Sequence, residues 1–341
     1  MHRLRSPIAL VATGLAAALL AGCSGAPADP PADGGTGQAT ITLYTSEPQE
    51  KADELVAAFT ESNPGIAVEV FRAGTGDLTA RIESERASGG IQADVLLAAD
   101  AGTFEDYAAE DLLLQYTPAD VDALSPEVVD PEGYYTGTRI IPTVIAYNTG
   151  VVTDPPTSWA ALTDPVYADR LVMPNPDVSG AAAYNAAVWL GEPELGERWM
   201  QDLAANRPVV ADSNGPVAQA VATGAQPVGI VVDYLVRELA EQGSPIAVAY
   251  PEEGVPFVSQ PAGIFAGTEQ PEAAQAFVDF LVSLEGQRLA VEQSYLPVRS
   301  DAGSPEGAPA LDDIAILSPD LETVRANQDA AVQTFRELFT R

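Results

Sequence analysis

The chain alternates between short apolar runs and longer amphipathic stretches. Apolar runs and alternating patterns predict strands at residues 40–44, 66–71, 94–98, 140–147, 167–173, 208–211, 228–232, 246–250 and 263–265. Apolar residues spaced three or four positions apart predict helices at 48–62, 76–87, 181–190, 193–205, 216–223 and 272–284, and along 321–338. The first five elements follow a β-α-β-α-β order, which predicts an α/β fold with a parallel sheet covered by helices on both faces.

This order of elements favours two α/β lobes joined by more than one crossing segment, which we place near residues 140–147 and 248–258. The first lobe is then discontinuous, with residues 39–142 and 257–300, and the second lobe holds residues 143–256. A helical segment at residues 301–341 is expected to pack on the second lobe. A pair of lobes connected in this way forms a cleft that can close on a ligand by a hinge motion.

The first 22 residues have the layout of a secretory signal peptide. Arg3 and Arg5 precede an apolar stretch at residues 8–20, and small residues precede Cys23. The apolar stretch is too short for a stable membrane span. The segment resembles a bacterial lipobox, which implies cleavage before Cys23, acylation of its thiol and anchoring to the cell membrane. Residues 23–38 then form a flexible tether; a secreted protein with an incidental free cysteine is the alternative.

The charge and histidine content exclude several classes of function. The chain has 16 Lys and Arg against 49 Asp and Glu, a net charge of −33, which excludes a general nucleic-acid binder. An anionic ligand would therefore have to be held by local groups rather than long-range attraction. The one histidine, His2, lies in the leader, so the mature chain has none for a Ser-His-Asp triad or a zinc site. We expect neither an enzyme nor a bound cofactor.

Four strand-to-helix junctions share small and hydroxyl-bearing residues: "LYTSEPQE", "RAGTGDL", "MPNPDVSGAAAYN" and "ADSNGPVAQA". A helix start leaves unpaired backbone N–H groups and carries about +0.5 of an elementary charge, so small residues there admit an anion. In open α/β sheets such junctions lie where ligands bind. In the first junction, Ser46 and Gln49 are expected to form a capping box. The candidate residues are Ser46, Gly74, Thr75, Gly76, Ser179, Gly180, Ser213 and Asn214, with plain helix caps as the alternative.

Two carboxylates lie beside these junctions. Glu47 follows the first strand, and Asp233 follows the run "GIVV" and precedes Tyr234. A carboxylate at a strand end can hold hydroxyl groups, an ammonium group or a metal ion, although a solvated acid at a helix start is the alternative. A rival hypothesis is an exported glycosidase with Glu47 and Asp233 as its acid and base, roughly 5 to 10 Å apart. A structural lipoprotein or adhesin would instead fill the cleft with bulky apolar residues.

Several segments together resemble the extracellular solute-binding proteins of ABC importers. They are the lipobox, "LYTSEPQEKADELVAAFTESNPGIAVE", "ADVLLAADAGTFEDY", "TVIAYNTG", "GIVVDYLV" and "PEAAQAFVDFLVSLEGQ". The similarity covers nearly all of residues 40–300 and points to the branch that binds ferric iron, phosphorylated sugars or phosphonates. It implies a two-lobe type II periplasmic-binding-protein fold, a monomer, and delivery of a small solute to a membrane permease driven by a separate ATPase.

The resemblance also bears on the ligand. Ferric-iron binders of this family place adjacent tyrosines where this chain has Asp233 and Tyr234. Relatives with phosphorylated ligands use hydroxyl groups and helix starts, which implies that Ser46, Thr75, Ser179, Ser213 and Asn214 hold an anionic group. Glu47 and Asp233 would then hold hydroxyl groups or an amine. A small organic phosphate or phosphonate is the favoured ligand; ferric iron, held by Glu47, Asp233 and Tyr234, is the alternative, and another anion or a polyamine stays open.

Overall fold

The structure is a computed structural model that describes residues 38–99, 101–309, 313–317 and 321–340. The predicted signal peptide, Cys23 and the tether up to residue 37 lie outside the described residues. Within the described ranges, no helix combines the length and the apolar composition that a membrane crossing requires.

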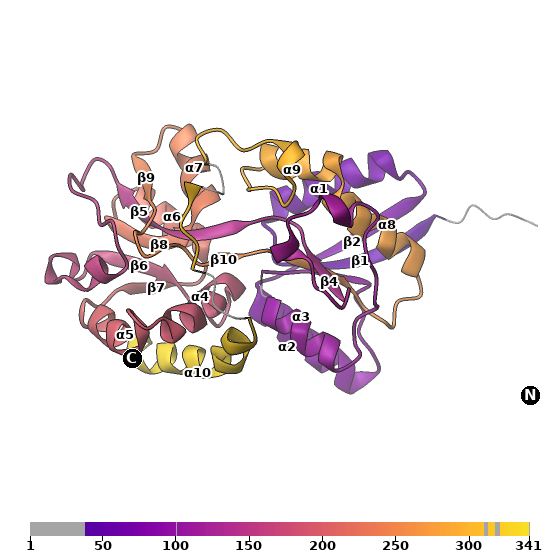
Figure 1. The fold of residues 1–341 in the computed structure, drawn as a ribbon, viewed down its shortest axis with the longest axis horizontal. Coiled ribbons are helices and arrows are strands. Elements are labelled where there is room, and N and C mark those ends of the chain that lie inside the picture. Colours follow the sequence, from indigo (N-terminus) through magenta and orange to yellow (C-terminus); the bar gives the residue numbers. More distant parts are fainter. Residues whose placement is uncertain (1–37, 100, 310–312, 318–320, 341) are drawn as a thin grey trace, which may run out of the picture. The chain divides into compact units, whose positions relative to one another are not determined.

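Two β-sheets organise the described chain (Figure 1). The first sheet has the order β2-β1-β3-β11-β4 and contains β1 (Ala39–Thr45), β2 (Ile66–Arg72), β3 (Val95–Leu97), β4 (Tyr135–Gly137) and β11 (Pro261–Ile264). The second sheet has the order β10-β5-β8-β6-β7, with β9 paired to β5, and contains β5 (Ile141–Asn148), β6 (Leu171–Pro174), β7 (Val209–Ala211), β8 (Val228–Val232), β9 (Ile246–Ala249) and β10 (Phe257–Val258).

The helices divide between the two sheets. Those that follow or flank the first sheet are α1 (Gln49–Ser62), α2 (Thr75–Ser88), α3 (Ala101–Ala109), α8 (Pro271–Val282) and α9 (Leu284–Glu292). Those associated with the second sheet are α4 (Gly180–Gly191), α5 (Gly196–Ala205), α6 (Asn214–Ala222), α7 (Asp233–Glu241) and α10 (Leu321–Phe339). Short 3₁₀ turns lie at Val121–Ala123, Pro126–Val128, Ala160–Thr163, Pro165–Tyr167 and Ser300–Ala302.

The first sheet is covered by helices on both faces. Strand β1 pairs in parallel with β2 and β3, whereas β11 is antiparallel to its neighbours. Leu43 packs toward α1 and α8, in a cluster that contains Phe59 and Phe277. The next residue, Tyr44, packs toward α2 and α3 in a separate cluster with Leu78. Successive side chains of a strand point to opposite faces, so this alternation gives the layered α/β arrangement that the sequence predicts.

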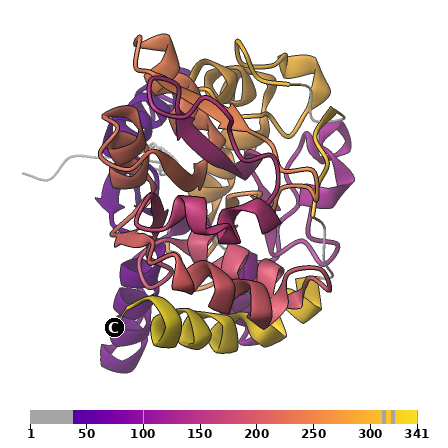
Figure 2. The ribbon, with the colours of Figure 1, turned by 90° about the vertical axis from the view of Figure 1, so that its left-hand side faces the viewer.

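The second sheet has its own core. Strand β6 is parallel to β7 and β8, and β5 runs antiparallel to β8, β9 and β10. Helix α10 packs along α4 and α5, and its Val324 and Phe335 belong to the core cluster of this sheet (Figure 2). We call the first sheet with its helices the first lobe, and the second sheet with α4 to α7 and α10 the second lobe.

The chain passes between the two sheets twice, and the segment between α9 and α10 then leads from the first lobe to the second. The chain leaves the first sheet after β4 and returns to it after β10, so the crossings are residues 138–140 and 259–260. The two crossings are bonded to each other, because the backbone N–H of Thr138 donates to the carbonyl oxygen of Ser259 at 2.9 Å. They are shorter than the crossing segments inferred from the sequence, since β5 and β10 already pair within the second sheet. Two adjacent crossings can act as a hinge between lobes, and we call residues 138–140 and 259–260 the hinge. The predicted lobe limits at 142 and 257 stay a prediction.

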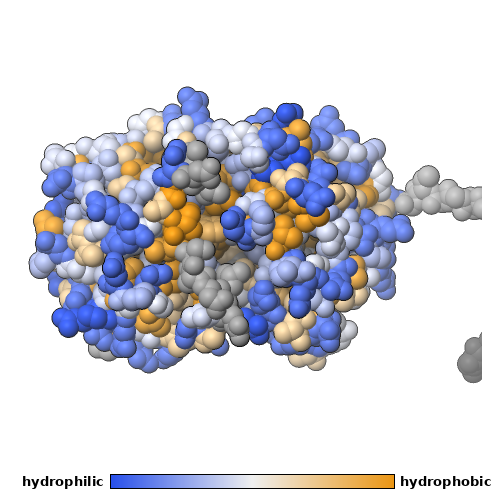
Figure 3. All heavy atoms as spheres, viewed as in Figure 1, coloured by the Kyte–Doolittle hydropathy of each residue, from blue (hydrophilic) through white to orange (hydrophobic). Residues whose placement is uncertain are grey.

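The surface seen in Figure 3 is mostly hydrophilic, with apolar side chains gathered near the middle of that face. This distribution fits a chain with 49 acidic residues, which remain hydrated.

Candidate functional site

A cavity of about 660 Å³ lies between the two lobes, at the carboxyl ends of strands from both sheets. Its size falls within the range of roughly 300–1,000 Å³ that is common for small-molecule sites. It brings together nine of the residues predicted from the sequence: Ser46, Glu47, Gly74, Thr75, Ser179, Gly180, Ser213, Asn214 and Tyr234. Gly76 and Asp233 are not part of this lining.

Five helices of the described chain begin at the cavity, and the N-cap residue of each lines it. These residues are Pro48 of α1, Gly74 of α2, Ser179 of α4, Ser213 of α6 and Val232 of α7. Among these five helices, a side-chain cap is present at α4 alone, where the Ser179 hydroxyl accepts from the N–H of Ala182 at 3.3 Å. At α7 the Asp233 carboxylate accepts from the N–H of Tyr234, while α1, α2 and α6 begin without a side-chain cap, which suits their first-turn N–H groups to a bound acceptor.

The predicted capping box at the start of α1 is wrong. The N-cap residue of α1 is Pro48, and the Gln49 side chain donates instead to Asp53 at 2.7 Å. Gln49 and Asp53 are one helical turn apart, so this local pair competes with the reach back to Ser46. Ser46 consequently belongs to the cavity wall and does not cap α1.

Asn214 holds the helix starts in place. Its amide nitrogen donates to the Ser179 hydroxyl at 3.1 Å, and its amide oxygen accepts from the backbone N–H of Val232 at 3.3 Å. These bonds join the beginnings of α4 and α6 to the end of β8. With both ends of its amide engaged, Asn214 serves to position the helix starts around the cavity.

Arg72 is a lining residue that the sequence patterns did not single out. It is the last residue of β2 and, among the described residues around the cavity, it alone carries a basic side chain. Its Nε donates to the carbonyl oxygen of Glu47 at 2.9 Å, which fixes the guanidinium group to the backbone that follows β1. The available signal was a basic residue two positions before Gly74 in a strongly acidic chain.

Glu47 lies in the cavity wall but is fully engaged by the protein. It is 2% exposed, and it accepts hydrogen bonds from Arg139 at 3.0 Å, from the Tyr295 hydroxyl at 3.0 Å and from the Gln260 amide nitrogen. Arg139 and Gln260 belong to the two hinge crossings. The Glu47 charge is thus neutralised inside the hinge, by partners that no local pattern in the sequence indicates.

Asp233 faces the protein interior. It is the first residue of α7, 1% exposed, and forms a buried ion pair with Arg237 one turn further along the helix. Burial raises the pKa of the Asp233 carboxyl, although Arg237 acts in the opposite direction. The following residue, Tyr234, lines the cavity, and burial followed by the nearby Glu47 charge raises the pKa of its phenol.

Three of the predicted glycines form a contact between the lobes. A Cβ atom added to Gly76 would lie 2.1 Å from the carbonyl oxygen of Asp177. At Gly74 it would lie 2.6 Å from that of Val178, and at Gly180 it would lie 2.7 Å from that of Ala99. We call these three glycines and the backbone facing them the glycine seam. The opposite lobe fills the space beside these glycines, which lets the starts of α2 and α4 meet backbone to backbone.

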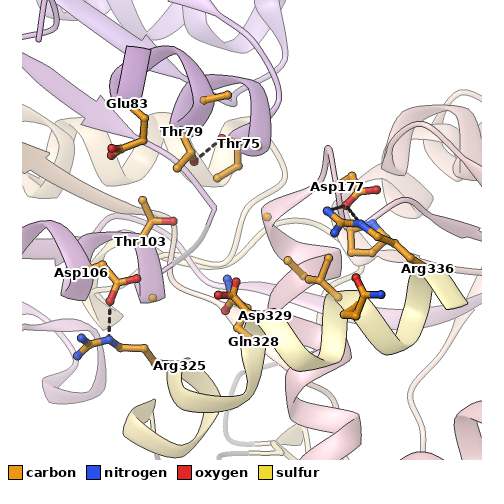
Figure 4. A pocket seen from close by; sticks show the side chains of 18 of the residues that line it. Thr75, Thr79, Glu83, Thr103, Asp106, Asp177, Arg325, Gln328, Asp329 and Arg336 are labelled. Carbon is orange, nitrogen blue, oxygen red and sulfur yellow. Dashed lines mark hydrogen bonds and ion pairs between the residues drawn. The ribbon is translucent and has the colours of Figure 1, made fainter. Parts of the chain in front are cut away.

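A second, larger hollow of about 1020 Å³ also borders the glycine seam, at Gly76, Asp177 and Gly180 (Figure 4). Helix α10 borders this hollow and forms ion pairs with residues of both lobes. Arg325 of α10 donates to Asp106 of α3 at 2.6 Å, and Arg336 donates to Asp177 at 2.7 Å. Helix α10 therefore belongs to the second lobe by packing but also contacts the first lobe through Arg325.

The family model for bacterial extracellular solute-binding proteins matches residues 91–339. The chain belongs to this family. Among curated proteins it is 27% identical over 293 residues to "Iron uptake protein A1" of Synechocystis, a match that spans 81% of this chain and 80% of that protein. It is 25% identical over 256 residues to a "Probable ABC transporter periplasmic-binding protein" of Sinorhizobium fredii, which spans 71% of this chain and 69% of that one.

Solved structures share the fold. The periplasmic binding protein AfuA of Actinobacillus pleuropneumoniae, with fructose-6-phosphate bound, superposes with a TM-score of 0.82 at 22% identity, over 89% of this chain and 99% of that one. Iron-bound HitA of Pseudomonas aeruginosa gives a TM-score of 0.76 at 24% identity, over 88% and 99%. The predicted two-lobe type II periplasmic-binding-protein fold is thus confirmed.

The family also answers the broader functional question. Its members capture small solutes outside the cytoplasm and pass them to a permease with an ATPase, so the expected transport role is confirmed. The glycosidase hypothesis is wrong, because the relatives are solute-binding transport proteins and not enzymes.

Proposed function

We propose that the protein captures a small organic phosphate or phosphonate in the 660 Å³ cavity and delivers it to its permease. One observation carries the proposal: five helix N-caps and the guanidinium group of Arg72 line a single cavity. Each helix start contributes about half a positive charge, and N–H groups of the first turn point outward to an acceptor. An arginine in addition offers paired N–H donors that match phosphate oxygens.

Local groups of this kind can hold an anion in a chain of net charge −33. Hydrogen bonds that involve a charged partner contribute about 1.5–3 kcal/mol each, and they act at contact distance, where screened distant charges matter little. The lining carboxylates do not counter this. Glu47 is neutralised by Arg139, and Asp77 and Asp212 are exposed to solvent.

We assign the acidic group of the ligand to the hydroxyl groups and first-turn amides at Ser46, Thr75, Ser179 and Ser213, with Arg72 beside them. Asn214 keeps the helix starts together through its bonds to Ser179 and Val232. Asp233 has no direct role in this proposal, because its buried carboxylate pairs with Arg237.

Ferric iron is the second candidate, favoured by the iron uptake proteins among the relatives and by two phenols near Glu47. The rings of Tyr234 and Tyr295 have centroids 4.5 Å apart. Two cations, however, stack on this pair: Arg139 and the Lys51 ammonium each lie 4.6 Å from the Tyr295 ring centroid.

The electrostatics of this phenol pair disfavour a trivalent cation. The two stacked cations repel it, and both oxygens of Glu47 are already occupied. Burial, with the Glu47 charge, raises the pKa of both phenols and so keeps them protonated. These observations favour the phosphate.

We further propose that the mature protein is a monomeric lipoprotein, anchored through Cys23 after removal of the signal peptide at residues 1–22. The support is the lipobox-like sequence before a Pro- and Gly-rich tether. Replacement Cys23→Ser should move the protein from the membrane fraction to the soluble extracytoplasmic fraction. Unchanged membrane association would contradict the anchor.

The decisive experiment is chemical identification of what the freshly purified protein releases on denaturation. Mass spectrometry should detect a phosphorus-containing organic anion in stoichiometric amount. Stoichiometric iron, with a visible phenolate-to-iron absorption band before denaturation, would contradict the proposal.

A site variant complements the mass spectrometry. Ser213→Glu places a carboxylate among the helix starts and should abolish binding of the released solute while the thermal unfolding temperature stays close to that of the parent. Ser304→Glu, at an exposed position away from the cavity, is the matched control and should bind normally. Normal binding by Ser213→Glu would contradict the assigned position of the anion.

A further inference from the structure

Gln260 occupies an unusual position in the hinge. It lies in the crossing segment between β10 and β11, it is 1% exposed, and it lines the 660 Å³ cavity. Its φ angle of 43° falls in the left-handed region, which residues other than glycine rarely adopt. A non-glycine residue keeps such a conformation when its surroundings impose it, and such residues occur often at ligand sites.

The hinge itself imposes this conformation. The Gln260 carbonyl oxygen accepts a hydrogen bond from the Thr138 hydroxyl at 2.8 Å and a longer one from the Thr138 N–H at 3.3 Å. Thr138 belongs to the other crossing segment. The backbone of Gln260 is therefore fastened at the point where the two lobes turn on each other.

The orientation of the Gln260 amide follows from its neighbour. Its nitrogen donates to Glu47, whose carboxylate can only accept. The reversed amide would set two oxygens against each other, so the identity of the amide atom that does not face Glu47 is fixed. That atom is the side-chain oxygen Oε1, which is buried and has no hydrogen-bond partner among the described residues. A buried acceptor without a donor is costly, and such atoms usually meet a ligand or water.

We propose that Gln260 Oε1 accepts a hydrogen bond from a hydroxyl group of the bound solute, and that Gln260 thereby selects hydroxylated organic phosphates over phosphates without such a hydroxyl group. This inference rests on the proposed function, since it assumes an organic phosphate in the cavity. In this arrangement the phosphate group of the solute contacts the helix starts and Arg72, and its hydroxyl group contacts Gln260 in the hinge.

A hydroxyl group fits this position better than an ammonium group. An ammonium would need a free carboxylate nearby, but Glu47 is already bonded to Arg139, Tyr295 and Gln260. Lys51 and Arg139, stacked on Tyr295, add positive charge to the same neighbourhood. A neutral donor satisfies Oε1 without that repulsion.

The test compares matched ligands on matched variants by isothermal titration calorimetry. The hydroxylated probes are glycerol 3-phosphate and glucose 6-phosphate, and n-propyl phosphate is the probe without hydroxyl groups on carbon. The parent protein should bind at least one hydroxylated probe roughly tenfold or more tightly than n-propyl phosphate, since a site built for a donor rejects the analogue that lacks it. Gln260→Met, which keeps the volume but removes the amide oxygen, should bring the two affinities within about twofold.

Tyr295→Phe is the control for a merely structural role. It removes another donor to Glu47 but leaves the Gln260 oxygen in place, so it should keep the preference for hydroxylated probes even if both affinities fall. Circular dichroism and thermal unfolding show whether each variant is folded. If Gln260→Met does not fold, the inference is still tested by the ratio of the affinities for a hydroxylated probe and for n-propyl phosphate, measured on the parent and on Tyr295→Phe.

The outcomes separate this inference from the proposed function. If the parent binds hydroxylated and plain phosphates equally, or if Gln260→Met keeps the parent preference, the role of Gln260 is wrong while the phosphate function stands. If none of the phosphates binds and the protein instead binds ferric iron, the proposed function is wrong and the inference falls with it.

Discussion

Replacement of Gly76 by alanine isolates the contact between the lobes from the folding of either lobe. Gly76 lies in the first turn of α2 and has no positive φ angle, so alanine suits the helix itself and could stabilise it by up to about 1 kcal/mol. The added Cβ, however, would lie 2.1 Å from the carbonyl oxygen of Asp177, against 3.4 Å for the shortest ordinary contact. The lobes must therefore separate at this point by the difference, about 1.3 Å.

We treat the arrangement in which the lobes touch at the glycine seam as the closed form, and the cost falls on this form alone. Forcing one extra carbon into a close-packed contact typically costs about 1–3 kcal/mol. Because the open state has no such contact, this cost lowers the population of the closed, ligand-binding form, and an equilibrium shift of 1–3 kcal/mol corresponds to roughly 5- to 150-fold in affinity. We expect Gly76→Ala to weaken binding of the retained solute by that factor, with an unfolding temperature equal to or above that of the parent.

Calorimetric titration measures the affinity, and small-angle X-ray scattering with and without solute measures closure. Gly191→Ala is the matched control, since Gly191 ends α4 and an added Cβ there meets nothing within 4 Å. The control should bind and close like the parent. If Gly76→Ala also bound and closed like the parent, the glycine seam would not be part of the closed state.

Two further predictions concern the anion. Arg72→Ala should weaken binding of the phosphate about 10- to 100-fold and reduce the salt dependence of binding. Arg72→Lys should recover only part of the lost affinity, because lysine lacks the paired donors. Equal affinity of Arg72→Ala and the parent by calorimetry would contradict the assignment. The only histidine, His2, lies in the signal peptide that we predict to be removed. The pH dependence of binding should therefore follow the ligand: the second pKa of a phosphate monoester is about 6, and affinity should fall as the pH drops through that value. Affinity that rises below that pH would indicate a different ligand.

Much of the fold could be predicted from the sequence because its signals are local. The apolar runs that became β1, β2 and β8 and the amphipathic stretches that became α1 and α8 each carry their own periodicity. Helix α7 was missed because it follows β8 without a break, and the strand residue Val232 is also its N-cap. Strand β4, only three residues long, has too few positions to show a pattern.

The candidate site likewise has parts that the sequence predicts and parts that it does not. The helix starts were predictable because a cap needs only a few consecutive residues. The partners of Glu47 in and beside the hinge were not predictable. Tyr295, for example, is 248 positions from Glu47 and meets it only in the folded chain. The glycines were recognised as small residues at helix starts, but the sequence could not show that the opposite lobe fills the space beside them.

The central claim is that helix starts from both lobes converge on one anionic group. A crystal structure of the protein with the solute it retains tests this most directly. The account predicts that the phosphate or phosphonate group lies within hydrogen-bond distance of the first-turn amides of α2 and α6 and of the Arg72 guanidinium. An acidic group bound elsewhere, or an iron ion on Tyr234 with no anion at the helix starts, would contradict it.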